Sequence, residues 1–260
     1  MSIPYYQVDA FTSHLFSGNP AGVCILADWL ADALLQSIAA ENNLAETAFV
    51  VQKGSDFGLR WFTPAIEMDL CGHATLAAAH VVFRHLGYGE SVIRFQTRSG
   101  LLAVTRSDEI LALDFPARPA TACSAPADLI EGLGRTPTFV GKSRDYLAVC
   151  ENESSIRELR PNMAALLRLD CLGIIVTGPG EQCDFVSRFF APRAGVPEDP
   201  VTGSAHCTLI PYWAQRLGRT KLRALQLSAR GGELFCEHRG ARVSMAGRAV
   251  TYSTGFLHVA

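Results

Sequence analysis

The sequence lacks the features that mark nucleic-acid-binding and membrane proteins. Its 23 basic and 25 acidic residues give a formal net charge of -2, so no broad basic surface is expected for phosphates or anionic lipid. It has no run of about 18 apolar residues, and its first residues do not form a signal-peptide pattern. We therefore expect a cytoplasmic protein with no nucleic-acid partner and no membrane partner.

Motifs for nucleotide cofactors and metals are also missing. No GxGxxG fingerprint occurs, and although Gly141-Lys142-Ser143 resembles the end of a phosphate-binding loop, Thr136 stands where its first glycine is required. The eight cysteines include no CxxC pair, and the histidines show no recognisable ligand spacing. We therefore expect no cofactor, no metal and no disulfide.

The chain does contain an internal repeat. Residues 44–64 align without a gap on residues 172–192, with six of 21 positions identical. After an offset of three residues, 72–87 aligns on 203–218, and both segments end in Leu-Gly. With 48% hydrophobic residues in 260, the chain can form two cores. Two copies of a long unit predict a pair of similar α+β domains related by an approximate twofold axis.

Each repeat is predicted to contain two strands, a proline-containing loop, a glycine and then a helix ended by another glycine. The helix after Gly72 is apolar on every side, which is typical of a buried helix. Either a curved sheet wraps this helix, or the repeat is an ordinary two-layer sandwich. The strands expected in the first half are Tyr5–Ala10, Thr47–Gln52, Leu59–Thr63, Val92–Thr97, Leu101–Thr105 and Ile110–Phe115.

Three further local features can be predicted. A proline- and alanine-rich segment, 116–126, indicates the boundary between the halves. A helix capped by Asp28 is expected to bury the stripe made by Leu30, Leu34, Leu35 and Ile38. Pro211 removes a hydrogen bond to the carbonyl of Cys207 inside the second long helix, so we expect a kink there.

The two helix starts, at Gly72 and Gly203, are candidate anion sites. A helix N-terminus presents unpaired N–H groups and the positive end of the helix dipole, which suit a substrate carboxylate. The alternative is that the two starts recur simply because the domains recur.

Polar residues near these helix starts break the symmetry of the repeat. Glu46 aligns with Ile174, and His73 aligns with Ser204. This difference favours one asymmetric active site, in which the ring of His73 lies at the mouth. The alternatives are that Glu46 is an exposed strand-edge residue and that Asp199 and Ser204 are ordinary helix caps.

Six motifs resemble the phenazine-biosynthesis (PhzF-like) isomerase family, whose relatives include diaminopimelate epimerase. The resemblance covers nearly the whole chain. The motifs are Val8–Thr12 (VDAFT), Gly18–Ala21 (GNPA), Asn43–Phe49 (NLAETAF), Arg60–Pro64 (RWFTP), Asp69–Ala79 (DLCGHATLAAA) and Asp199–His206 (DPVTGSAH).

The resemblance implies a specific architecture. Two barrel-like domains, each a curved, mostly antiparallel sheet around a central helix, would hold the active site in the cleft between them. The last strand, at about Thr251–Val259, would cross back to the first domain. The domains would be 1–117 with about 250–260, and 118–249. The family resemblance also suggests a homodimer.

The resemblance also implies roles for individual residues. Glu46 would be the general acid/base, and His73 and Asp199 would be its catalytic partners. The backbone at Gly72 and Gly203 would bind a carboxylate of the substrate, with His73, Ser204 and Asp199 as further substrate-binding groups. The reaction would move a proton between carbons of a small carboxylic acid, as in isomerisation of trans-2,3-dihydro-3-hydroxyanthranilate, without cofactor or metal.

Two other functions are considered. The epimerase relatives use one thiol from each half, and Cys71 stands where the first thiol would be. In the second half, Cys207 lies several residues inside a buried helix, where a thiolate would be poorly stabilised. The other possibility is a non-catalytic protein that binds a small ligand or another protein through the same fold.

Overall fold

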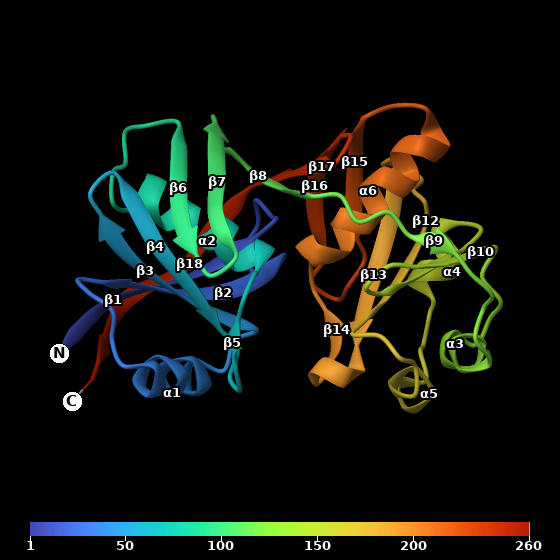
Figure 1. Cartoon of the computed structure of the whole chain (residues 1–260), viewed down its shortest axis with the longest axis horizontal. Coiled ribbons are helices and arrows are strands. Elements are labelled where there is room, and N and C mark those ends of the chain that lie inside the picture. The colour runs from blue at the N-terminus through green and yellow to red at the C-terminus, as the bar shows by residue number, and fades with distance from the viewer. Residues whose placement is uncertain (260) are drawn as a thin grey trace. The chain divides into compact units, whose positions relative to one another are not determined.

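The computed structural model describes residues 1–259, which form a mixed α+β structure made mostly of strands (Figure 1). The chain divides into two compact units. Unit 1 comprises Met1–Asp114 with the residues from Ala246 onward, and unit 2 comprises Phe115–Met245. These divisions fall a few residues before those expected at 117/118 and 249/250.

Unit 1 contains two helices and all the strands that were expected there. Each strand predicted from the sequence overlaps an observed one, and β2 and β5 are additional. Its elements are β1 (Ser2–Ala10), β2 (Asn19–Leu26), α1 (Asp32–Asn42), β3 (Glu46–Lys53), β4 (Asp56–Phe62), β5 (Glu67–Met68), α2 (Gly72–Arg84), β6 (Val92–Thr97), β7 (Gly100–Ser107), β8 (Ile110–Pro116, which runs into unit 2) and β18 (Ala249–His258).

Strand pairing in unit 1 brings the two ends of the chain together. β1 lies between β18 and β2 and is antiparallel to both. Figure 1 shows the last strand, in red, running back beside the blue first strand. The last strand of the chain thus pairs with the first strand within unit 1.

Helix α2 is buried, as its composition predicted. It packs against β1, β2, β3 and β18, and Leu76, Ala77 and Val81 have no exposed surface. It ends at Arg84 with His85 as C-cap, so the expected cap at Gly87 is wrong by two residues. The helix start at Gly72 is as predicted.

Helix α1 begins one turn later than predicted. The side chain of Asp28 accepts a hydrogen bond from the adjacent N–H of Trp29 at 2.8 Å, and the residue at the N-cap is Ala31. The predicted start is therefore wrong, because Trp29 and Leu30 precede the helix and pack on its core as loop residues. Leu35 and Ile38 are buried as the stripe predicted.

Unit 2 has more short helices than the repeat indicated. Its elements are β9 (Thr121–Ala122), α3 (Ala127–Leu133), β10 (Phe139–Lys142), β11 (Tyr146–Val149), α4 (Glu153–Arg157), α5 (Met163–Leu167), β12 (Ile174–Pro179), β13 (Phe185–Ala191), the 3-10 turn η1 (Pro192–Ala194), β14 (Val196–Asp199), α6 (Gly203–Leu217), β15 (Lys221–Gln226), β16 (Gly232–Arg239) and β17 (Arg242–Gly247, which runs into unit 1).

The repeat seen in the sequence is present in the strand pairing of the two units. In unit 1, β2 and β3 are parallel, β3 and β4 form an antiparallel pair, and β4 and β6 are parallel. In unit 2, β11 and β12 are parallel, β12 and β13 form an antiparallel pair, and β13 and β15 are parallel. The long helix, α2 or α6, follows the antiparallel pair in each unit.

Helix α6 continues through Pro211 and ends at Leu217, and Gly218 follows as the predicted glycine C-cap in the left-handed conformation. Proline cannot donate to the carbonyl of Cys207. The backbone N–H of Arg118 donates to that carbonyl instead, at 2.8 Å. A residue from outside the helix thus replaces the missing bond, and the kink stays a prediction.

Within residues 1–259, no helix has both the length and the hydrophobicity needed to span a bilayer.

Candidate functional site

Three elements of unit 1 bring a cluster of polar side chains together. Glu46 is the first residue of β3, and Asn19 is the first residue of the neighbouring strand β2. Cys71 is the N-cap of α2, and His73 is its second residue. Because each residue stands at the start of its element, the cluster lies where two parallel strands and the buried helix begin.

His73 is at the centre of this cluster. Its Nε2 lies 3.1 Å from Oε2 of Glu46. On the other side of the ring, Nδ1 lies 3.2 Å from the amide nitrogen of Asn19 and 3.6 Å from Sγ of Cys71. The structure therefore brings Glu46 and His73 together at the start of the helix that begins with Gly72.

The cluster is shielded from water. His73 is 5% exposed and Asn19 is fully buried, so the ring of His73 does not lie at the mouth of the site as expected. That expectation failed because the residue after a helix start can point toward the sheet as well as toward solvent. Polar groups buried in this way depend on each other for hydrogen bonds, because water is not available to solvate them.

The contact between Glu46 and His73 is close but poorly aligned. Oε2 and Nε2 are within ion-pair distance, but neither atom makes a well-formed hydrogen bond to another group within residues 1–259. Electrostatic attraction at this distance does not require hydrogen-bond alignment. Both atoms therefore keep hydrogen-bonding capacity for a third group.

Burial and charge act on the titratable groups of the cluster. Burial raises the pKa of Cys71, and the charge of Glu46 raises it further. Burial alone would lower the pKa of His73, but its interactions with Cys71 and Glu46 outweigh burial and raise the pKa well above its ordinary value. Cys71 is therefore a neutral thiol near neutral pH, and His73 binds a second proton readily.

The same side chains were considered as metal ligands. Within residues 1–259, Glu46, Cys71 and His73 are the only group of possible ligands close enough to share an ion. However, Glu46 faces Nε2 of His73 and Cys71 faces Nδ1, whereas a metal ion binds one ring nitrogen. An ion could use both neighbours only if a side chain moved, so this geometry favours a proton-transfer network.

The predicted residues of unit 2 gather around the start of α6. Asp199 ends β14, and its Oδ2 accepts a hydrogen bond of 2.6 Å from the hydroxyl of Thr202. Gln226, which is buried, accepts from the N–H of Thr202 at 2.8 Å and donates to the carbonyl of Asp199 at 2.8 Å. The turn before Gly203 is thus held from both sides.

Ser204 has a partner that sequence reasoning missed. The guanidinium of Arg144 donates to the Ser204 hydroxyl at 3.0 Å and pairs with the buried carboxylate of Asp145 at 2.8 Å. The N–H of Gly173 donates to Asp145 at 3.1 Å. Nothing in the sequence around Arg144 indicated a site, because Arg144 and Ser204 lie 60 positions apart in the chain.

Asn19 of unit 1 was also missed by sequence reasoning. It stands inside the GNPA motif and could have been considered there.

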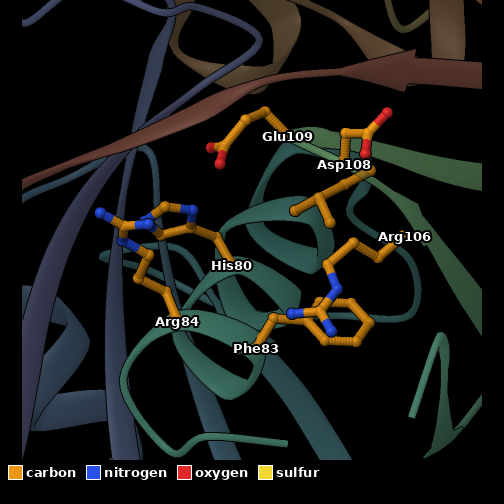
Figure 2. A pocket seen from close by; sticks show the side chains of 7 residues that line it. His80, Phe83, Arg84, Arg106, Asp108 and Glu109 are labelled. Atoms are coloured by element: carbon orange, nitrogen blue, oxygen red, sulfur yellow. The ribbon is translucent and has the colours of Figure 1, made fainter. Parts of the chain in front are cut away.

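A separate pocket of about 230 Å³ in unit 1 contains none of the predicted site residues. Figure 2 shows His80, Phe83 and Arg84 of α2 on one side, and Arg106 lying against the ring of Phe83. Burial lowers the pKa of His80 to about 4, so it is neutral at physiological pH. The remaining charged groups, Arg84, Arg106, Asp108 and Glu109, balance in sign. The pocket therefore has no charge preference that would indicate a ligand.

Comparisons with known proteins agree with the resemblance found in the sequence. A family model described as phenazine biosynthesis-like protein (PhzC-PhzF) matches residues 8–255. Two proteins of Pseudomonas aeruginosa, each named as an uncharacterized isomerase, are similar over almost their whole length. One is 56% identical over 256 residues, which is 98% of both chains, and the other is 52% identical over 259 residues, which is 100% of both.

Solved structures give the same result. A PhzF-family phenazine biosynthesis protein of Enterococcus faecalis matches with a TM-score of 0.98 and 45% identity over 100% of both chains. A hydroxyproline epimerase of Agrobacterium vitis matches with a TM-score of 0.65 over 98% of this chain and 92% of the epimerase, and at 10% identity it shows a likeness of fold alone. The chain therefore belongs to the PhzF family of phenazine biosynthesis-like proteins, and its fold is similar to that of the hydroxyproline epimerase.

Proposed function

We propose that this protein is an isomerase that moves a proton between carbons of a small carboxylic acid, with Glu46 as the general acid/base. The observation that carries the proposal is the contact between Oε2 of Glu46 and Nε2 of His73 in a buried cluster. A base next to a proton-bearing ring is a common arrangement for general acid/base catalysis. The two P. aeruginosa relatives that are more than half identical are also named isomerases.

In this mechanism, ionised Glu46 removes a proton from a carbon of the substrate. The neutral carboxylic acid then returns it to another carbon of the same conjugated system. His73 stabilises the charge on Glu46 before the transfer and can donate a hydrogen bond during it. The developing negative charge on the substrate is delocalised and is stabilised by fixed donors. These steps use groups of the protein alone, so we propose that neither cofactor nor metal is needed.

The residues of unit 2 are proposed to bind the substrate. The start of α6 at Gly203 offers backbone N–H groups to a carboxylate, and the Ser204 hydroxyl lies beside them. Asp199 is held next to this turn by Thr202. We also propose that each unit derives from one ancestral repeat with a curved sheet around its long helix, which the matching strand pairings support.

A two-thiol racemase is less well supported. That reaction needs one thiolate near neutral pH, but the pKa of Cys71 is raised by burial. Burial also raises the pKa of Cys207 to about 11. Both thiols are therefore protonated under ordinary conditions, and Glu46 is the better base.

The experiment that tests the proposal follows deuterium from heavy water into the substrate by mass spectrometry. Wild type is compared with Glu46→Gln and with Glu41→Gln, an exposed glutamate that serves as the matched control. The panel contains trans-2,3-dihydro-3-hydroxyanthranilate and other small unsaturated and amino carboxylic acids.

We expect label with wild type and Glu41→Gln, and none with Glu46→Gln. Label that persists in a folded Glu46→Gln variant would refute the role of Glu46. Label that is lost in Cys71→Ala and retained in Glu46→Gln would favour the thiol mechanism. Saturable binding of a panel member with no label from any would favour a binding protein.

A further inference from the structure

We infer that Asn19 is a positioning residue that keeps a hydrogen on Nε2 of His73, the ring nitrogen that lies beside Glu46. The carboxamide nitrogen of Asn19 lies 3.2 Å from Nδ1 of His73. An amide nitrogen only donates hydrogen bonds, so a ring nitrogen facing it must act as the acceptor. Nδ1 of the neutral ring is then bare, and the single ring hydrogen resides on Nε2, which is the nitrogen that faces Glu46 at 3.1 Å.

The thiol of Cys71 acts in the same direction. Its Sγ lies 3.6 Å from the same Nδ1. Because burial keeps this thiol protonated, it can donate a weak hydrogen bond to the ring. A thiol is a weaker donor than an amide, so Asn19 is the principal partner and Cys71 the auxiliary one.

The position of Asn19 is rigidly fixed. Asn19 is fully buried and is paired in register with Ala10 of β1. The preceding residue, Gly18, has φ of +67°, and a Cβ atom there would lie 2.2 Å from the carbonyl oxygen of Ala10. Only glycine fits this turn, which accounts for the Gly-Asn sequence and aims the side chain of Asn19 at the ring.

The position of the ring hydrogen affects the proton transfer by Glu46, an effect that rests on the proposed function. A ring nitrogen that already bears hydrogen cannot accept the proton that Glu46 takes from the substrate. The proton therefore stays on Glu46 and is available for return to the second carbon. If the hydrogen moved to Nδ1, bare Nε2 would compete for that proton, and catalysis would weaken.

The test begins with the ring nitrogens of His73, observed by NMR in protein labelled with ¹⁵N-histidine and without substrate. The His73→Gln variant assigns the signals, and spectra are recorded from pH 6 to 10 so that the neutral ring is included. We expect the neutral ring of wild type to bear its hydrogen on Nε2.

Asn19→Asp is the decisive variant, because it has nearly the same shape but presents an acceptor instead of a donor. We expect the hydrogen to move to Nδ1, with kcat lowered on the order of 10²-fold and a changed pH profile. Cys71→Ala, which retains Asn19, should keep the Nε2–H form and lose less than about threefold in kcat, because the thiol is only the weaker donor.

A neutral wild-type ring with its hydrogen on Nδ1 overturns the inference, even if Asn19→Asp fails to fold. An unchanged tautomer in folded Asn19→Asp overturns it as well. Failure of the proposed function gives a different result, namely an Nε2–H ring in wild type together with no isomerisation of any panel compound.

Discussion

His73 and His206 are both buried near the start of the long helix of their own unit, yet their surroundings differ. His73 faces the carboxylate of Glu46 through Nε2 and two donors through Nδ1. His206 donates from Nδ1 to the backbone carbonyl of Thr202 at 2.8 Å, and its Nε2 has no hydrogen-bond partner within residues 1–259. The hydrogen of the neutral ring is thus on opposite nitrogens in the two histidines.

Because their surroundings differ, the pKa values of His206 and His73 are shifted in opposite directions. Burial lowers the pKa of His206 to about 4, because no charged partner opposes it. The pKa of His73 is raised despite burial, because its interactions with Cys71 and Glu46 outweigh burial. Burial alone therefore does not raise the pKa of a histidine. The carboxylate of Glu46 contributes to the difference, and the aligned position in unit 2 is the apolar Ile174.

The largest expected effect is on activity. His73→Gln should lower kcat by about 10² to 10⁴, because it removes the group that stabilises and aims Glu46. His206→Gln should stay within about threefold of wild type, since its amide can still donate to the carbonyl of Thr202. Initial rates on a substrate identified from the panel would check both. Equal losses in the two variants would mean that both histidines serve folding alone.

The next effect is on stability at acid pH. The unfolded pKa of histidine is about 6.5, and that of His206 in the folded protein is about 4. Above pH 6.5 the residue is neutral in both states. As pH falls from 6.5 toward 4, the unfolded chain binds a proton that the folded protein excludes, so the free energy of unfolding decreases by up to about 3 kcal/mol.

Urea unfolding of wild type, His206→Gln and the exposed-residue control His14→Gln, at pH 7.5, 6.5, 5.5 and 5.0, measures this effect. The loss of stability on acidification should be smaller in His206→Gln than in the other two proteins. Equal slopes in all three would show that His206 is not buried as a neutral ring.

A third effect makes the two histidines more alike. Glu46→Gln removes the charge that raises the pKa of His73, so the pKa should fall, and the affinity of the ring for its second proton should decrease by about tenfold or more. NMR titration of the ring against the Glu41→Gln control would detect this. A pKa of His73 that is unchanged in Glu46→Gln would assign the upward shift to another group.

The sequence predicted the two units and their long helices better than it predicted helix boundaries and side-chain contacts. The repeat, the buried helix and the helix starts at Gly72 and Gly203 were predictable because apolar periodicity and glycine have strong local effects. The family resemblance, now confirmed, indicated Glu46 and His73, and the structure brings these two together. The start of α1 was wrong, because the capping preference of Asp28 is weak compared with the packing of Trp29 and Leu30.

The contacts around each predicted residue could not be read from the sequence. Asn19 reaches His73 because α2 packs against β2, and Arg144, between β10 and β11, reaches Ser204 of α6. Such contacts join residues more than 50 positions apart, and no local pattern reports them. The orientation of the His73 ring depends entirely on these partners, which is why its burial was mispredicted.

The smallest expected effect concerns the helix starts, where His73 in α2 corresponds to Ser204 in α6. In the proposed function, Ser204 contributes one neutral hydroxyl, already in contact with Arg144, to a carboxylate that the backbone N–H groups of α6 would also bind. Ser204→Ala should therefore raise KM about three- to tenfold and leave kcat nearly unchanged, because the lost hydrogen bond acts equally on substrate and transition state. The exposed Ser154→Ala on α4 is the matched control. A fall in kcat with unchanged KM would instead place the Ser204 hydroxyl in proton transfer, and the two helix starts would then share one chemical role.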